Sequence, residues 1–260
     1  SVVFHSTCFP FLRGVYLEAW TEKCAAFFTR LAKTHPSVNI YLENSFDIDP
    51  QPMKKLSEQI TEQEDILDGF EDDIGAYLVK LAPFVVSETD SRRVTGMLHA
   101  IGNFERLGDH ALNLLEVSRE INDKGIVFSA EANKELEVII AALTEIIRLT
   151  ADAYIDVDMD KAVCVEPLEQ VIDDLKEQLR TNHILRLQKE KCSIAAGFVW
   201  SDLLTNFERV SDHCSNIAGC LIDASAHNLN VHKSLRANRH GNSQYDEMYR
   251  ESTAKYSVME

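Results

Sequence analysis

Pairs of acidic residues spaced four positions apart are the residues of this chain whose types and spacing suggest chemistry. On a helix this spacing places both carboxylates on one face, one turn apart. Like charges so placed destabilise an isolated helix, whereas a bound cation would reverse the sign of their effect. We therefore expect cation ligands among them. The eight candidates are Glu64, Asp68, Glu105, Asp109, Glu169, Asp173, Glu208 and Asp212.

Two of these pairs lie in a twelve-residue segment that occurs twice, as NFERLGDHALNL at 103–114 and NFERVSDHCSNI at 206–217. Seven of the twelve positions are identical. With 42 acidic residues in the chain, a single pair at this spacing would be expected by chance. The prediction of a cation site therefore depends on the recurrence of the pairs with the same neighbours. The repeated neighbours expected to support the ligands are Asn103, Arg106, His110, Asn113, Asn206, Arg209, His213 and Asn216.

Carboxylate oxygens without thiolates suit hard cations, so Mg, Mn, Ca and iron are the candidates and zinc is disfavoured. His110 and His213 fall on a helical row offset from the acids. We expect each to pack against a neighbour or donate a hydrogen bond, with metal ligation as the alternative. The sequence shows neither a nucleophile beside a base nor a glycine-rich phosphate loop, which argues against an enzyme. A di-iron oxidase would need His where this chain has Gly108 and Ser211.

The composition favours a helical protein that attracts cations. The chain has 260 residues, with few glycines (10) and prolines (6), and a net charge of −16. Such an acidic surface argues against nucleic acid and against simple adhesion to an anionic membrane. The six cysteines form no CxxC pair, which indicates free thiols in a reducing compartment. No segment reaches the roughly 20 apolar residues of a membrane-spanning helix, so we expect a cytoplasmic location.

Long helices are predicted to position the acids. From 91 to 121, apolar residues recur at alternating steps of three and four, the pattern of a bundle helix. The segment 19–46 is also periodic but contains Pro36, which predicts a kink or a break. Ser129 and Asp158 are expected helix caps. The periodic segments that we predict as helices are 52–81, 91–121, 130–155, 159–187 and 193–224.

The two halves of the chain align with each other. Residues 61–70 match 166–175, which pairs Glu64 with Glu169 and Asp68 with Asp173. The fold expected from this duplication is all-α, with two tandem three-helix bundles and a short C-terminal helix. The predicted units are an apolar N-terminal segment at 1–18, a first repeat at 19–122, a second at 129–226, and a polar tail with a terminal helix at 227–260.

The duplicated unit and its E-R-[LV]-x-D-H block resemble the PhoU family of phosphate-homeostasis proteins over roughly 47–226. The resemblance implies that the eight acids hold metal clusters, with iron as the first choice and Mg, Mn or Ca as alternatives. EQEDILDGFEDDIGAYLVKL and DSRRVTGMLHAIGNFERLGDH are also similar to the cytoplasmic PhoU-like region of bacterial sodium/phosphate cotransporter-family proteins. The start, VVFHSTCFPF, resembles the end of their last membrane segment.

The resemblance implies a metal-binding regulatory domain in phosphate homeostasis, as the cytoplasmic part of a sodium-dependent phosphate transporter at the inner face of the cell membrane. Its partner would be the membrane domain of that transporter or a phosphate-signalling protein, with self-association as a further option. The alternative is a free-standing PhoU-like adaptor that regulates phosphate uptake or signalling through protein contacts. In that case the acids would serve as docking sites for a basic partner.

Overall fold

The chain is built from long helices. The computed structural model describes residues 50–84, 87–225 and 243–258, and within these ranges it contains no strand, which confirms the all-α class. The five predicted helices are present, with bounds that differ by a few residues. The elements are α3 (Pro50–Leu81), η2 (Ala82–Phe84), α4 (Glu88–Asp123), α5 (Ala130–Asp156), α6 (Met159–Gln188), α7 (Ile194–Ser225) and α9 (Ser243–Lys255).

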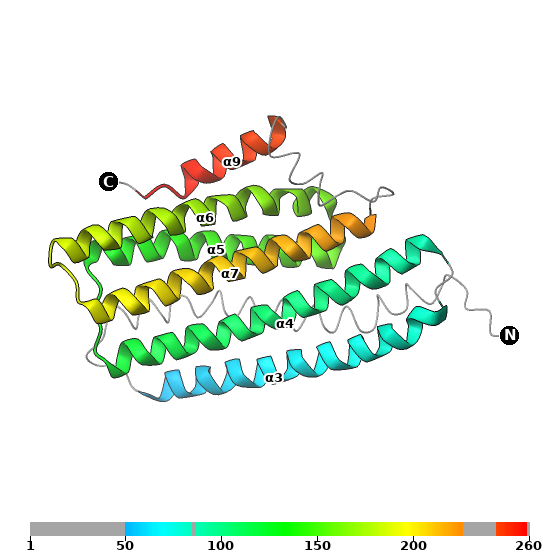
Figure 1. The fold of residues 1–260 in the computed structure, drawn as a ribbon, viewed down its shortest axis with the longest axis horizontal. Coiled ribbons are helices and arrows are strands. Elements are labelled where there is room, and N and C mark those ends of the chain that lie inside the picture. The colour runs from blue at the N-terminus through cyan, green and yellow to red at the C-terminus, as the bar shows by residue number, and fades with distance from the viewer. Residues whose placement is uncertain (1–49, 85–86, 226–242, 259–260) are drawn as a thin grey trace.

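The helices run side by side along one long axis (Figure 1). Helices α5, α6 and α7 pack against one another as a complete three-helix unit, and α3 packs on α4. The most extensive contact, between α4 and α7, joins the two halves. The predicted segments 1–18 and 19–46 lie outside the described residues, so two helices of the first repeat are described. None of the described helices is long and apolar enough to cross a membrane.

Side-chain caps fix where two of the helices begin. The Ser129 hydroxyl accepts a hydrogen bond from the backbone N–H of Ala132, and the Asp158 carboxylate accepts from those of Asp160 and Lys161. These bonds satisfy backbone donors that have no partner inside the first helical turn. Both predicted caps are therefore confirmed, and they set the register with which α5 and α6 present their apolar faces.

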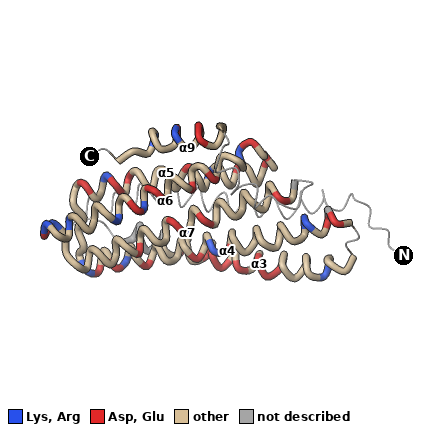
Figure 2. Tube along the Cα trace, turned by 45° about the horizontal axis from the view of Figure 1, so that its top comes forward, with Lys and Arg blue, Asp and Glu red and all other residues tan. Residues whose placement is uncertain are grey.

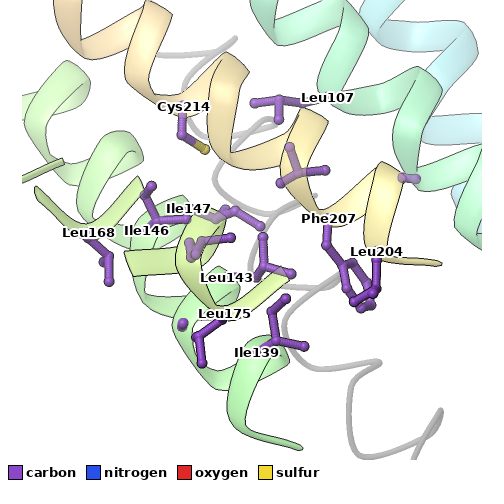
Figure 3. Close-up of a cluster of buried hydrophobic side chains, with 14 of the residues drawn as sticks. Leu107, Ile139, Leu143, Ile146, Ile147, Leu168, Leu175, Leu204, Phe207 and Cys214 are labelled. Carbon is purple, nitrogen blue, oxygen red and sulfur yellow. The ribbon is translucent and has the colours of Figure 1, made fainter. Parts of the chain in front are cut away.

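The core lies where α4, α5, α6 and α7 meet (Figure 3). Ile139 and Ile146 of α5 are fully buried, and Leu107 of α4 and Cys214 of α7 point into the same cluster. Burying one such aliphatic side chain stabilises a fold by about 1.5–3 kcal/mol. This core holds α4 and α7 in place, so that the acids beside their apolar stripes lie at its rim.

A buried ion pair joins α5 to α6 at one end of the bundle. The Arg186 guanidinium donates to both oxygens of Glu135, at 2.8 and 2.7 Å, and the Asn182 amide donates to Glu135 Oε1 at 2.8 Å. Arg186 also lies over the Trp200 ring of α7, 5.1 Å from its centroid. The two charges of this pair therefore neutralise each other within the chain.

The predicted C-terminal helix is α9, which lies on α6. The side chains of Lys255 and Tyr256 both donate to the carboxylate of Glu145 on α5. The hydroxyl of Tyr249 donates to Asp174 Oδ2 at 2.5 Å. Tyr249, Lys255 and Tyr256 thus dock this C-terminal segment onto the second three-helix unit.

Candidate metal centre

The two copies of the repeated segment face each other across the contact between α4 and α7. His110 Nδ1 of α4 lies 2.9 Å from Asn206 Oδ1 of α7, and His213 Nδ1 of α7 lies 2.9 Å from Asn103 Oδ1 of α4. The two imidazoles stack with their centroids 5.4 Å apart. Each asparagine therefore pairs with the histidine of the other copy, and we call these four residues the His/Asn seam.

Both amides of the seam are oriented by their own helix. Asn103 Nδ2 donates to the carbonyl of His99 at 2.7 Å, and Asn206 Nδ2 donates to that of Asp202 at 2.9 Å. Each amide oxygen is thereby turned toward a histidine, which must donate from Nδ1. The seam thus occupies one nitrogen of each ring.

His213 is the more deeply buried of the two rings, with 8% of its surface exposed. Burial, followed by the positive charges of His110, Arg106 and Arg209, lowers its pKa to about 4. The ring is therefore neutral near pH 7, as a histidine that donates from Nδ1 alone must be.

Glu169, Asp173, Glu208 and Asp212 form the second carboxylate cluster, between α6 and α7. One carboxylate oxygen from each of Glu169, Asp173 and Asp212 lies within 4.8 Å of the other two. Burial, followed by the charges of Asp212 and Glu208, raises the pKa of Asp173 to about 6. Burial also raises the pKa of Asp212, with Glu208 as the next cause.

The fourth carboxylate of this cluster has a cationic partner. Lys176 Nζ lies 2.5 Å from Glu208 Oε1, and the Lys176 side chain is only 18% exposed. Asp173 Oδ1, by contrast, is buried without a hydrogen-bond partner among the described residues. Three converging carboxylates, one with an unsatisfied buried oxygen, are an all-oxygen donor set that fits a hard cation.

Glu64 and Asp68 of α3, with Glu105 and Asp109 of α4, form the first carboxylate cluster. Figure 2 shows acidic residues gathered along the middle of α3 beside α4. Burial raises the pKa of Glu105 to about 7, and the charges of Asp109, Glu71 and Asp68 add to this. Burial is also the largest cause of the raised pKa values of Glu64 and Asp68, and Asp109 contributes to both. The acids of the two helices therefore repel one another.

A glycine brings α3 and α4 together at the level of this cluster. A Cβ atom on Gly108 would lie 3.0 Å from Leu67 Cδ1 and 3.5 Å from Glu64 Cγ, so a larger residue would require the end of the Leu67 side chain to shift. In the second copy this position is Ser211, which is fully buried and donates to the carbonyl of Glu208 at 2.8 Å. Glycine at this position leaves room for the Leu67 side chain of α3 beside α4.

Glu71 and Lys176 belong to the clusters, although neither was among the predicted site residues. The Glu71 carboxylate lies close to α4, with Oε1 3.6 Å from where a Cβ on Gly102 would be. The alignment that pairs Glu64 with Glu169 also pairs Glu71 with Lys176. The two residues could therefore have been identified from the sequence, because they occupy an aligned position at which the two halves carry opposite charges.

The remaining predicted supporting residues are largely exposed, and one of them contacts a cluster carboxylate. Arg209 forms an ion pair of 3.9 Å with Asp212 of its own helix and is 60% exposed. Arg106, Asn113 and Asn216 are exposed to solvent. Among the described residues, Glu169, Asp173 and Asp212 are the only group of three predicted acids whose ligand atoms lie within 4.8 Å of one another, and the first cluster shows no such group. The seam contains both predicted histidines but only two of the four predicted asparagines.

The chain is similar in sequence to proteins of phosphate transport. Residues 42–118 and 137–221 match the model of the PhoU domain. A phosphate-specific transport system accessory protein PhoU homolog of Thermotoga maritima is 24% identical over 164 residues, 62% of this chain and 69% of the relative. A homolog of the same name from Clostridium acetobutylicum is 22% identical over 167 residues, 63% of this chain and 74% of the relative.

The fold is similar to two crystal structures. PhoU from Pseudomonas aeruginosa matches with a TM-score of 0.65 and 20% identity, over 80% of this chain and 96% of that one. The phosphate transport system regulatory protein PhoU from Streptococcus pneumoniae matches with a TM-score of 0.64 and 17% identity, over 84% of this chain and 98% of that one. At these identities the structures establish a shared fold.

Proposed function

Because the chain belongs to the PhoU family, we propose that it is a regulatory accessory protein of phosphate transport that binds hard cations at its two carboxylate clusters. The relatives in Thermotoga maritima and Clostridium acetobutylicum are named as accessory proteins of phosphate-specific transport systems. The match to the family model confirms the resemblance to PhoU. The closer similarity to a sodium/phosphate cotransporter region stays a prediction.

The accessory-protein hypothesis has better support than that of a domain attached to a transporter. The named relatives are accessory proteins, and this chain matches most of their length. The transporter hypothesis was based on the similarity of EQEDILDGFEDDIGAYLVKL and DSRRVTGMLHAIGNFERLGDH to a cotransporter region and on the apolar start, whose residues 1–18 lie outside the described residues. We therefore propose that the protein acts through contacts with a separate membrane transporter or a phosphate-signalling protein, in the cytoplasm at the inner face of the membrane.

The convergence of Glu169, Asp173 and Asp212 within 4.8 Å is the observation that carries the cation proposal. Their charges repel one another, and a cation would turn this repulsion into attraction and tie α6 to α7. In the first cluster, Glu64, Asp68, Glu105 and Asp109 would tie α3 to α4 in the same way. The oxygen donors suit iron, Mn, Mg or Ca.

Elemental analysis of the full chain, purified under metal-replete conditions, tests this proposal. We expect bound metal in the wild type and a loss of metal in Asp173→Asn/Asp212→Asn. A matched control is Glu62→Gln/Glu137→Gln, which removes two exposed acids outside the clusters and should leave the metal content unchanged. A wild type without bound metal would show that the cation proposal is wrong.

The regulatory part is tested in cells that lack their own PhoU-type accessory protein. Expression of this chain should restore the dependence of phosphate uptake on external phosphate. Unchanged uptake, despite soluble expression of the folded chain, would argue against an accessory role.

A further inference from the structure

We infer that Lys176 acts as a built-in counter-cation of the second carboxylate cluster, so that this cluster binds divalent cations less strongly than the first. This inference rests on the proposed function. Lys176 Nζ lies 2.5 Å from Glu208 Oε1, and the side chain is mostly shielded from solvent. The ammonium group therefore removes Glu208 from the set of carboxylates that are free to bind a metal ion.

The position equivalent to Lys176 in the first cluster has the opposite charge. It is Glu71, whose charge is among the causes that raise the pKa of Glu105. No ion pair joins Glu71, Glu105 or Asp109 to a basic residue within the described part of the chain. At this aligned position the second repeat therefore has an internal cation, whereas the first has a further carboxylate.

The charge counts of the two clusters differ accordingly. When fully ionised, the first cluster and Glu71 carry five negative charges, whereas the four negative charges of the second are offset by the mostly shielded Lys176 and by the exposed Arg209, which lies 3.9 Å from Asp212. Affinity for hard divalent cations rises with the number of charged oxygen ligands. A lysine ammonium is a compact point charge, so it can neutralise neighbouring carboxylates as a bound metal ion would. Bound cations should therefore relieve more electrostatic repulsion in the first cluster than in the second, and should bind to it more strongly.

The geometry limits what the second cluster can hold. With Glu208 bound to Lys176, the converging ligands are Glu169, Asp173 and Asp212. A triad of carboxylates provides one small site. The first cluster spreads its acids over α3 and α4, where Asp68 and Asp109 are exposed and accessible to ions.

Exchanging the charges at the two equivalent positions tests the inference. Mn²⁺ is the probe, and its dissociation constant and bound number per chain are measured by calorimetry and electron paramagnetic resonance. The second cluster is measured in a background of Asp68→Asn/Asp109→Asn, and the first in a background of Asp173→Asn/Asp212→Asn. Each background leaves one cluster intact, so that binding is assigned to a cluster.

Lys176→Glu should strengthen Mn²⁺ binding at the second cluster by about tenfold or more, given the size of one charge at close range. Lys176→Met, which removes the charge without adding an acid, should give a smaller gain. Glu71→Lys should weaken binding at the first cluster by a similar factor. The matched controls Lys134→Glu and Glu62→Lys make the same charge changes at exposed positions outside the clusters, and should have little effect.

The outcomes separate the inference from the proposed function. If the unmodified protein binds no Mn²⁺ in either cluster, the cation part of the proposed function is wrong and the inference fails with it. If the protein binds Mn²⁺ but Lys176→Glu, Lys176→Met and Glu71→Lys match their controls, the proposed function stands and the inference alone is overturned. Circular dichroism confirms that each variant is folded.

Discussion

The polar groups in the His/Asn seam have hydrogen-bond partners within the chain, whereas most carboxylates of the two clusters face other carboxylates. In the seam, His110 pairs with Asn206 and His213 with Asn103. The Glu135 carboxylate likewise has its partners within the chain, in Arg186 and Asn182. In the clusters, carboxylates face mainly other carboxylates, and the pKa of Glu105 is raised to about 7.

This difference separates residues that stabilise the fold from residues that weaken it. A buried polar group with a partner adds to stability, whereas crowded like charges subtract from it. The two copies of the seam are chemically alike because each supplies the other's partner. The two clusters differ in charge at the aligned positions Glu71 and Lys176. Substitutions in the two regions should therefore change stability with opposite signs.

The largest effect is expected at the buried ion pair. Glu135→Ala leaves the Arg186 charge buried without its carboxylate and should lower the free energy of unfolding by about 3–5 kcal/mol. Urea unfolding measures this, with the exposed Glu137→Ala on the same helix as control. The double variant Glu135→Leu/Arg186→Met should regain much of the loss. A single-variant loss no greater than that of the control would contradict the assignment.

The seam should show a smaller loss. His213→Leu removes the donor to Asn103 Oδ1 and should cost about 1–3 kcal/mol, the range for an unsatisfied buried acceptor. Asn113→Ala, in the same repeated segment but exposed, should be nearly neutral. A double-mutant cycle with Asn103→Leu measures the coupling between the two residues. Additive losses would mean that the hydrogen bond contributes nothing.

The dependence of stability on pH should distinguish the regions in the metal-free protein. The folded-state pKa values of Glu105, about 7, and Asp173, about 6, exceed their ordinary values of 4.5 and 3.8. Between those limits the folded chain binds more protons, so these groups destabilise it increasingly as pH rises. The pKa of His213, lowered to about 4 from 6.5, has the reverse effect: its stabilising contribution is lost as pH falls from 6.5 toward 4.

Comparing wild type with Glu105→Gln/Asp173→Asn isolates the carboxylate part of this dependence. The double variant should gain stability relative to wild type as pH rises from 5 to about 7.5, measured by urea unfolding in the presence of chelator. The gain should be smaller than the loss at the buried ion pair, since both acids are partly hydrated. A difference that does not change with pH would show that these groups keep ordinary pKa values.

The smallest effect is expected from one neutralised acid at fixed pH. Glu105→Gln removes repulsion with Asp109 and should stabilise the metal-free chain by about 0.2–0.5 kcal/mol at pH 8. Added Mn²⁺ should stabilise wild type more than this variant. A variant less stable than wild type without metal would place Glu105 among the residues that support the fold.

Much of this architecture could be predicted from the sequence because helical periodicity and caps are local properties. The helices from 52 to 224 and the caps Ser129 and Asp158 required only nearby residues. The segment 19–46 lies outside the described residues, so its predicted helix stays a prediction.

The cross-helix partners could not be predicted in the same way. Periodicity shows that His213 and Asn103 lie beside an apolar stripe, but it does not show which helix each stripe meets. The role of Gly108 depends on the approach of Leu67 from α3, which no local pattern encodes. Lys176 could have been found, since the alignment of the repeats sets it opposite Glu71.

Diffraction from metal-replete crystals, collected on both sides of the absorption edge of the added metal, tests the central claim most directly. We expect anomalous density between Glu169, Asp173 and Asp212, and stronger density between α3 and α4 beside Glu105. Density at neither cluster in crystals grown with saturating metal would contradict this expectation and would show that the acids are not metal ligands.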